Sequence, residues 1–238
     1  MLKKLIFCIL TITLFLNLFS IQTRAIENSE EKVIYLTFDD GLSPKMTDLF
    51  IDILNENEVK GTFFVIGNTL EKNQQTLKRI IDYGHGLGLH TYSHEAKTIY
   101  KSKESFLDEM LQTQKLIKEL TGKKVNIIRF PFGSKNRYFT LTNEWIDTIH
   151  NNNLKIYDWN VDTHDGEYPK NSSYNIYRST ISNKNNIILL MHCTSLNKNS
   201  AIALKETIKY YKSKNYTFKI IDDSTPELYS FKLQKNKK

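Results

Sequence analysis

Short runs of apolar, β-branched and aromatic residues recur along the chain, separated by longer segments whose apolar residues repeat at helical spacing. The short runs are typical of buried strands, and the longer ones of amphipathic helices. We predict strands at 33–38, 61–66, 86–90, 125–130, 154–159, 187–191 and 217–221. We predict a first helix beginning at Ser43-Pro44, followed by helices at 69–83, 102–121, 141–152, 173–183 and 198–214.

The regular alternation of strands and helices predicts an α/β fold built on a mostly parallel sheet. A chain of 238 residues suits one domain of ordinary size. It has no dinucleotide-type glycine fingerprint, so we expect a distorted and incomplete (β/α) barrel of about seven parallel strands rather than an open doubly wound sheet. Such a barrel should gather its chemistry at the C-terminal ends of the strands.

The first 25 residues differ from the rest of the chain. "MLKK" is basic, "LIFCILTITLFLNLFSI" is apolar, and "QTRA" ends in a small residue. This pattern predicts a signal peptide over 1–25, cleaved after Ala25, and a catalytic domain over 26–238. The alternative is an uncleaved anchor, because the apolar run approaches the length of a spanning helix. We therefore expect a secreted or cell-wall-associated protein, or a membrane-anchored one if the segment is uncleaved.

Charge and cysteine content narrow the possible partners. Removing the three basic residues of the predicted signal leaves 30 basic against 26 acidic residues, a net charge of +4. This mild excess is compatible with an anionic cell wall and gives no nucleic-acid signature.

Cys8 lies in the predicted signal, so Cys193 would be the mature protein's one cysteine, and we expect it to fill the core. We expect a monomer.

Polar side chains follow five of the predicted strands at the point where each one ends. They comprise Asp39 and Asp40, His90 with His94 one turn beyond, "RFPFG" from Arg129 to Gly133, "DWNVDTHD" from Asp158 to Asp165, and His192. In a parallel barrel these positions all meet at one rim. The pattern therefore predicts a catalytic site there.

His90 and His94 stand four residues apart, a spacing that can place both imidazoles on one metal ion. Asp40 could add an oxygen ligand, and such a set leaves positions open for water and substrate, as hydrolysis requires. Asp39 would then be free to act as a general base. The competing interpretation is that "DDG" is an ordinary turn and the histidines lie on a helix surface.

Two further residues fit this chemistry. Arg129 lies at the end of an apolar strand, where a buried guanidinium would need an anion, and Asp39 is the expected partner. The alternative is that Arg129 is exposed at the surface. The turn around Pro131 and Gly133 could offer backbone amides to an oxyanion. His192 could protonate a leaving group if Asp165 or Asp162 orients it; otherwise it is a core histidine. Aromatic residues near the strand ends, including Trp159 and Tyr168, could stack on sugar rings.

Five segments in this order, "TFDDG", "HTYSH", "RFPFG", "DTHD" and "LMH", resemble the motifs of the polysaccharide deacetylases, which are carbohydrate esterase family 4 or NodB-homology domains. The resemblance covers residues 31–223. It implies a distorted (β/α) barrel and one divalent metal ion, zinc or alternatively cobalt, nickel or manganese.

The resemblance also implies roles for individual residues. Asp39 would be the general base held by Arg129, and the metal ligands would be Asp40, His90 and His94. The backbone amide of Phe132 would stabilise the oxyanion. His192 would be the general acid tuned by Asp165, and Leu190 would line a pocket for the acetyl methyl group.

Three positions depart from the family pattern. Gly166 stands where the family usually has Trp, which removes one wall of the acetyl pocket unless Trp159 or Tyr168 replaces it. Leu89 replaces a common Asn before the first metal histidine, and Phe132 replaces a frequent Tyr whose backbone alone is needed. The residues for metal binding and proton transfer are all present, so the resemblance implies activity and leaves the choice of substrate open.

We therefore expect a metal-dependent hydrolase that removes N-acetyl groups from a cell-wall or extracellular polysaccharide and releases acetate. Peptidoglycan is the expected polymer, with a muramic-acid-type sugar as one possibility. The alternatives are an O-deacetylase such as an acetylxylan esterase, a chitooligosaccharide deacetylase, and a degenerate protein that binds glycan without hydrolysing it.

Overall fold

The computed structural model describes residues 31–230 of the chain. The expected signal segment 1–25 lies outside this range, so its boundary stays a prediction. Eight strands form one sheet: β1 Val33–Asp39, β2 Gly61–Val65, β3 Gly86–Leu89, β4 Ile127–Ile128, β5 Lys155–Ile156, β6 Val161–Asp162, β7 Asn186–His192 and β8 Thr217–Phe218. None of the helices within the described range is long and apolar enough to cross a membrane.

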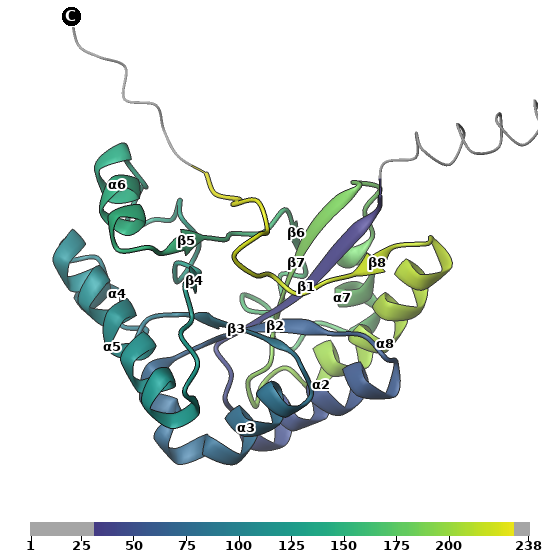
Figure 1. Ribbon diagram of the computed structural model, residues 1–238. Helices are drawn as coiled ribbons and strands as arrows, with labels where there is room; N and C mark the ends of the chain where they lie inside the picture. The colour runs from purple at the N-terminus through teal and green to yellow at the C-terminus, as the bar shows by residue number, and fades with distance from the viewer. Residues whose placement is uncertain (1–30, 231–238) are drawn as a thin grey trace, which may run out of the picture. The chain divides into compact units, whose positions relative to one another are not determined.

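Seven strands follow one another in the order β5-β4-β3-β2-β1-β7-β6, and all of their pairings are parallel (Figure 1). β8 pairs with the start of β1, ahead of the segment that pairs with β2. The end strands β5 and β6 do not pair with each other, so the sheet is curled but not closed. The predicted incomplete (β/α) barrel is confirmed.

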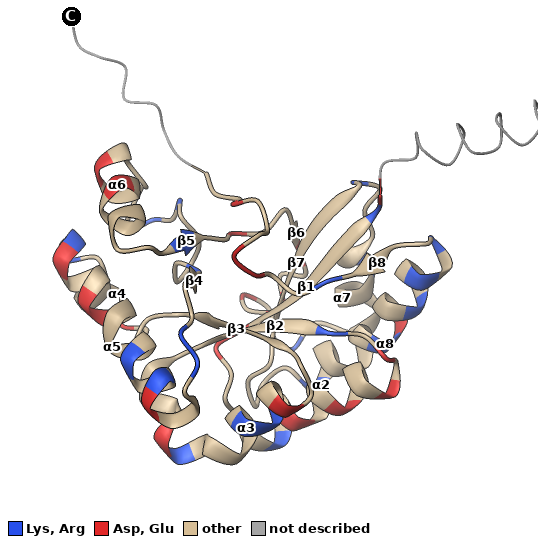
Figure 2. Ribbon diagram, in the orientation of Figure 1, with Lys and Arg blue, Asp and Glu red and all other residues tan. Residues whose placement is uncertain are grey.

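Helices connect the strands and cover the outer face of the sheet. They are α2 Pro44–Glu56, α3 Gln74–Asp82, α4 Ala96–Ile99, α5 Lys103–Thr121, α6 Asn143–Asn151, α7 Ser173–Thr180 and α8 Lys198–Ser213, with short 3-10 turns at Gly67–Thr69 and Glu71–Asn73. The longest, α5, is capped at its start by the Ser102 hydroxyl, which accepts the Ser105 amide proton, and is followed by Gly122, whose φ of 72° suits glycine. Charges of both signs are interspersed along it (Figure 2).

Some predicted boundaries were wrong. The strands expected at 125–130 and 154–159 shrink to the two-residue β4 and β5, while β6 and α4 were not predicted. The reason is that the run of buried residues is longer than the run of strand hydrogen bonds. Phe130 and Tyr157 are fully buried, although they come after the ends of β4 and β5. β6 is only two residues long, too short for a periodic pattern to reveal it.

The central strand β1 shows how the fold positions the site. Ile34, Leu36 and Phe38 alternate along it and are fully buried, and Phe38 packs against Phe50 of α2 with ring centroids 5.2 Å apart. The intervening side chains of a strand point to the opposite face. Thr37 therefore points into the barrel, and so does Asp39 at the end of the strand.

Candidate active site

Asp39 and Arg129 form a buried ion pair inside the barrel. Arg129 Nη1 donates to Asp39 Oδ1 over 2.8 Å and to the Thr37 hydroxyl over 2.7 Å. Its Nε donates to the Tyr157 carbonyl, and its Nη2 to the Asp158 carbonyl. Arg129 is fully buried, so the alternative of an exposed arginine is wrong. The four contacts hold the guanidinium rigidly, and the guanidinium in turn fixes the direction of the Asp39 carboxylate.

Asp40 points a different way from its neighbour. Its φ of 67° lies in the left-handed region, where a non-glycine residue is strained, and the chain turns there as β1 ends. Asp40 Oδ1 lies 3.4 Å from Nε2 of both His90 and His94. It has no hydrogen-bond partner among the described residues, although it is buried. An unsatisfied buried carboxylate oxygen facing two imidazoles is costly without a cation.

The two histidines come from the end of β3 and from the loop that follows it. His90 is buried, and its Nδ1 lies 2.9 Å from the Arg129 carbonyl oxygen, an acceptor. Nδ1 must therefore carry a proton, so Nε2, which faces Asp40, is the ring atom that could bind a metal ion. His94 sits beyond the loop at a φ of 59°, with its ring centroid 5.1 Å from that of His90.

These three residues fit a divalent metal ion. Their ligand atoms all lie within 4.8 Å of one another, and no other such group of three occurs in the part of the chain that is described. Ligand atoms that sit 2.0–2.1 Å from one tetrahedral ion are about 3.4 Å apart, and the two Asp40 Oδ1 distances are both 3.4 Å. Two imidazoles and a carboxylate are a donor set suited to zinc and similar ions.

The surrounding charges keep Asp40 ionised. Burial alone would raise the pKa of its carboxyl, but the contact with His90 and the positive potential of the three nearby histidines lower that pKa well below its ordinary value. Asp40 is therefore a carboxylate at neutral pH, as a metal ligand must be.

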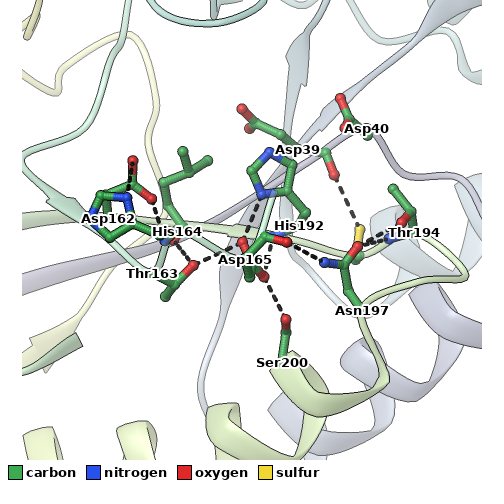
Figure 3. A network of polar contacts seen from close by, with 12 residues as sticks. Asp39, Asp40, Asp162, Thr163, His164, Asp165, His192, Thr194, Asn197 and Ser200 are labelled. Atoms are coloured by element: carbon green, nitrogen blue, oxygen red, sulfur yellow. Dashed lines mark hydrogen bonds and ion pairs between the residues drawn. The ribbon is translucent and has the colours of Figure 1, made fainter. Parts of the chain in front are cut away.

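His192 ends β7, beside Asp39 of β1, and pairs with Asp165 (Figure 3). His192 Nδ1 donates to Asp165 Oδ1 over 2.8 Å, and the His192 amide donates to Oδ2 over 3.0 Å. The hydroxyl of Ser200 also donates to Oδ2. Asp162, the other candidate partner of His192, accepts instead from the Trp159 indole Nε1–H over 2.9 Å. Asp165 is thus the residue that orients His192.

This contact favours the protonated imidazole. Burial lowers the pKa of His192, but the hydrogen bond and charge of Asp165, with the further charges of Asp39 and Asp40, raise it to about 9. The same contact lowers the pKa of Asp165 against the opposing effect of its own burial. His192 can therefore carry a proton at neutral pH, which a general acid requires.

The turn after Arg129 presents Phe132 to the site. Phe132 has a φ of 66°, and its ring packs edge-on against His94 with centroids 5.2 Å apart. Among the described residues its backbone amide has no acceptor, whereas the next amide, that of Gly133, donates to the Phe130 carbonyl. The Phe132 N–H is thus available to a ligand. Phe132 also lines the cleft and packs its ring against His94, whereas the sequence predicted a role for its backbone amide alone.

The candidate residues meet in one cleft of about 320 Å³. It is lined by Asp39, Asp40, His90, His94, Phe132, Trp159, Asp162, His164, Gly166, Glu167, Leu190 and His192. Arg129 and Asp165 lie behind it and hold the lining residues. Tyr168 is 62% exposed and lies outside this lining, so its substrate-binding role stays a prediction.

Gly166 brings the backbone directly against His192. A Cβ atom at this position would lie 2.5–3.0 Å from the imidazole ring atoms, closer than van der Waals contact allows. The imidazole therefore occupies the space beside Gly166. Trp159 lines the same cleft, held at its indole nitrogen by Asp162 and packed against Gly133. It can supply the apolar wall that the sequence lacks at position 166.

Of three further lining residues, His164 and Glu167 had been given no role, and Asp162 had been considered only as a partner of His192. Asp162, His164 and Glu167 all belong to the "DWNVDTHDGE" segment, whose density of polar residues after a strand was the available signal. Asp162 accepts the His164 amide proton over 2.7 Å.

Cys193 is buried in the core, where burial raises the pKa of its thiol, so the expected packing role is confirmed.

Fold and sequence together define the class of this enzyme. A family model described as polysaccharide deacetylase matches residues 26–151, and the chain belongs to that family. It is a polysaccharide N-deacetylase by class, in agreement with the resemblance seen in the five motifs.

Particular relatives refine this placement. The chain is 33% identical to the putative polysaccharide deacetylase YheN of Bacillus subtilis, over 86% of this chain and 71% of that protein. It is 34% identical to the peptidoglycan-N-acetylglucosamine deacetylase PgdA of Listeria monocytogenes, over 85% of this chain but 40% of that protein. The crystal structure of the polysaccharide deacetylase Bc1974 from Bacillus cereus superposes with a TM-score of 0.77 at 29% identity, covering 84% of this chain and 97% of that one.

Proposed function

We propose that this protein hydrolyses the N-acetyl groups of an amino sugar in peptidoglycan, with zinc as its metal ion, and releases acetate. The observation that carries the proposal is the unpartnered Asp40 oxygen, which lies 3.4 Å from two imidazoles in a cleft also lined by Asp39 and His192. The similarity to PgdA supports peptidoglycan as the polymer. Action on such a polymer fits the predicted export of the domain to the cell wall.

Asp40, His90 and His94 would hold the metal, which supplies Lewis acidity to water and to the acetamide carbonyl. The chain's own groups carry out the proton transfers. Asp39, aligned by Arg129, accepts a proton from the attacking water. The Phe132 amide donates to the oxyanion that develops on the carbonyl.

His192 completes the reaction by giving its proton to the departing amine, which would otherwise leave as an unstable anion. Asp165 keeps the imidazole protonated and correctly turned before this step. The products are acetate and a free amino group on the sugar. Asp39 and His192, which are register partners on the neighbouring strands β1 and β7, thus divide the work of base and acid.

Mass spectrometry of substrates after incubation with zinc-loaded protein tests the proposal. Peptidoglycan fragments, chitooligosaccharides and acetylxylan are compared, and acetate is measured in parallel. We expect loss of 42 mass units, one acetyl group replaced by hydrogen, from an amino sugar of peptidoglycan. Release from acetylxylan alone indicates the O-deacetylase, and release from chitooligosaccharides alone indicates the chitin-type enzyme.

The variant Asp39→Asn separates catalysis from binding. It should abolish acetate release while zinc still binds, because Asp39 is not one of the ligands. Asp82→Asn is the matched control, since Asp82 pairs with Lys78 on the exposed face of α3 and should leave activity unchanged. Glycan binding without acetate release from the wild-type protein would overturn the proposal in favour of a binding protein.

A further inference from the structure

Glu109 is a charged residue on the buried face of a helix. In α5 the buried side chains are Phe106, Glu109, Met110, Thr113 and Ile117, which form one apolar stripe interrupted by the carboxylate. Glu109 is only 9% exposed. A carboxylate at such a position needs hydrogen-bond donors to offset its desolvation.

Those donors come from the loop between the two candidate histidine ligands. Glu109 Oε2 accepts the amide proton of Tyr92 over 2.9 Å and that of Ser93 over 2.6 Å. Charge-assisted bonds of this kind are about twice as strong as neutral ones. A side chain of α5 thus holds the backbone midway between His90 and His94.

The same loop is also held by the segment that follows β2. The amides of Gly67 and Asn68 donate to the carbonyls of Thr91 and Tyr92, each over 2.9 Å. A Cβ atom on Gly67 would lie 2.5 Å from the Thr113 hydroxyl and 2.6 Å from the Tyr92 ring. The loop is therefore packed tightly against both residues 67–68 and α5.

This packing maintains a strained backbone. Thr91 and His94 both have positive φ, at 65° and 59°, which is unfavourable for any residue with a Cβ atom and most of all for the β-branched Thr91. Such conformations persist only where surrounding contacts impose them. His90 is fixed independently through the Arg129 carbonyl, so loosening the loop would displace His94 from His90.

We propose that Glu109 is a positioning residue for the metal site, which sets the affinity for a divalent cation by fixing the loop that carries His94. The proposal rests on the metal-binding role of Asp40, His90 and His94. Glu109 itself need not touch the ion or the substrate. Loss of residues that orient metal ligands typically weakens metal affinity by about 10–100-fold.

The experiment titrates metal-free protein with zinc, using calorimetry and competition with a chelator. Glu109→Leu removes both hydrogen bonds and should weaken zinc binding by about 10–100-fold. Glu109→Gln keeps one acceptor oxygen of similar reach and should weaken it by less, roughly threefold to tenfold. With cobalt in place of zinc, the visible absorption bands of Glu109→Leu should shift or weaken because the ligand geometry has changed.

Met110→Ala is the matched control, because Met110 is fully buried on the same helix and both loop amides donate to Glu109 and not to Met110. It should lower the melting temperature of the metal-free protein without changing zinc affinity. Wild-type affinity in both Glu109 variants would overturn the proposal. If Glu109→Leu does not fold, a wild-type affinity for zinc in Glu109→Gln is enough by itself to overturn the proposal. Failure of the wild-type protein to bind zinc would instead overturn the proposed function.

Discussion

The Arg129 guanidinium donates to the Asp39 carboxylate over 2.8 Å, although the two residues are 90 positions apart in the chain and both are buried. The positive guanidinium compensates the negative charge of Asp39. This reduces the repulsion between the adjacent carboxylates of Asp39 and Asp40, so Asp40 can face the two histidines. Stability and chemistry at this site therefore depend on the same pair.

Arg129→Met should destabilise the metal-free protein by about 3–5 kcal/mol, because it leaves a buried carboxylate without its partner. Urea unfolding measures the effect. The double variant Asp39→Asn with Arg129→Met should recover part of this loss, since the unpaired charge is then absent. Equal stability of the wild-type protein and Arg129→Met would contradict the role given to the pair.

The activity should fall as pH rises through about 9, because His192 acts in its protonated form and its pKa is raised to about 9 by Asp165. The protonated form is present below this pKa and lost above it. Asp165→Asn removes the negative charge, so the pKa of His192 falls and the alkaline limb of kcat/KM should move to lower pH. A limb that stays in place in this variant would show that another group is responsible for it.

Gly166→Ala should lower kcat by about 10–100-fold with the fold intact, because a Cβ atom there would displace the His192 ring, and misplacement by about 1 Å can cost this much. The family pattern alone would suggest that a larger side chain at this position improves the acetyl pocket. Gly84→Ala is the control: φ is 73° there but no atom lies within 4 Å, so it should cost stability and not kcat. A rise in kcat for Gly166→Ala would refute the steric argument.

Zinc should raise the melting temperature of the wild-type protein, since a ligand that binds only the folded state stabilises it by about 2.7 kcal/mol at a hundred times its Kd. Asp40→Ala should lose this response. Chelation should abolish acetate release, and added zinc should restore it. Activity that survives exhaustive removal of metal would count against the metal-dependent mechanism.

Much of this site could be predicted from the sequence, because parallel strands place their C-terminal ends at one rim. Asp40, His90 and His192 are found where strands end and His94 lies shortly beyond the end of β3, as predicted, and the four line one cleft. Arg129 was paired correctly with Asp39 because a charge on an apolar strand needs a counter-ion. Among the helices, the predicted segment at 102–121 and α5 nearly coincide, since its periodic pattern is long and its caps are clear.

Other features depended on contacts between distant segments. Glu109 is 15 or more residues from either histidine, and only the packing of α5 against the loop brings its carboxylate to the Tyr92 and Ser93 amides. The close approach of position 166 to the His192 ring is likewise a contact between separate segments, and no local sequence pattern encodes it.

The sequence by itself thus determined the order of elements, the rim at which the chemistry gathers and the residue types available there, because these follow from periodicity and strand direction. Only the tertiary structure decided that Asp165 rather than Asp162 orients His192, and only it fixed the contacts of the two pairings already expected, Asp39 with Arg129 and Asp40 with the two histidines. Pairing of this kind depends on side-chain direction and on distances of a few ångströms, which are set when remote segments pack together.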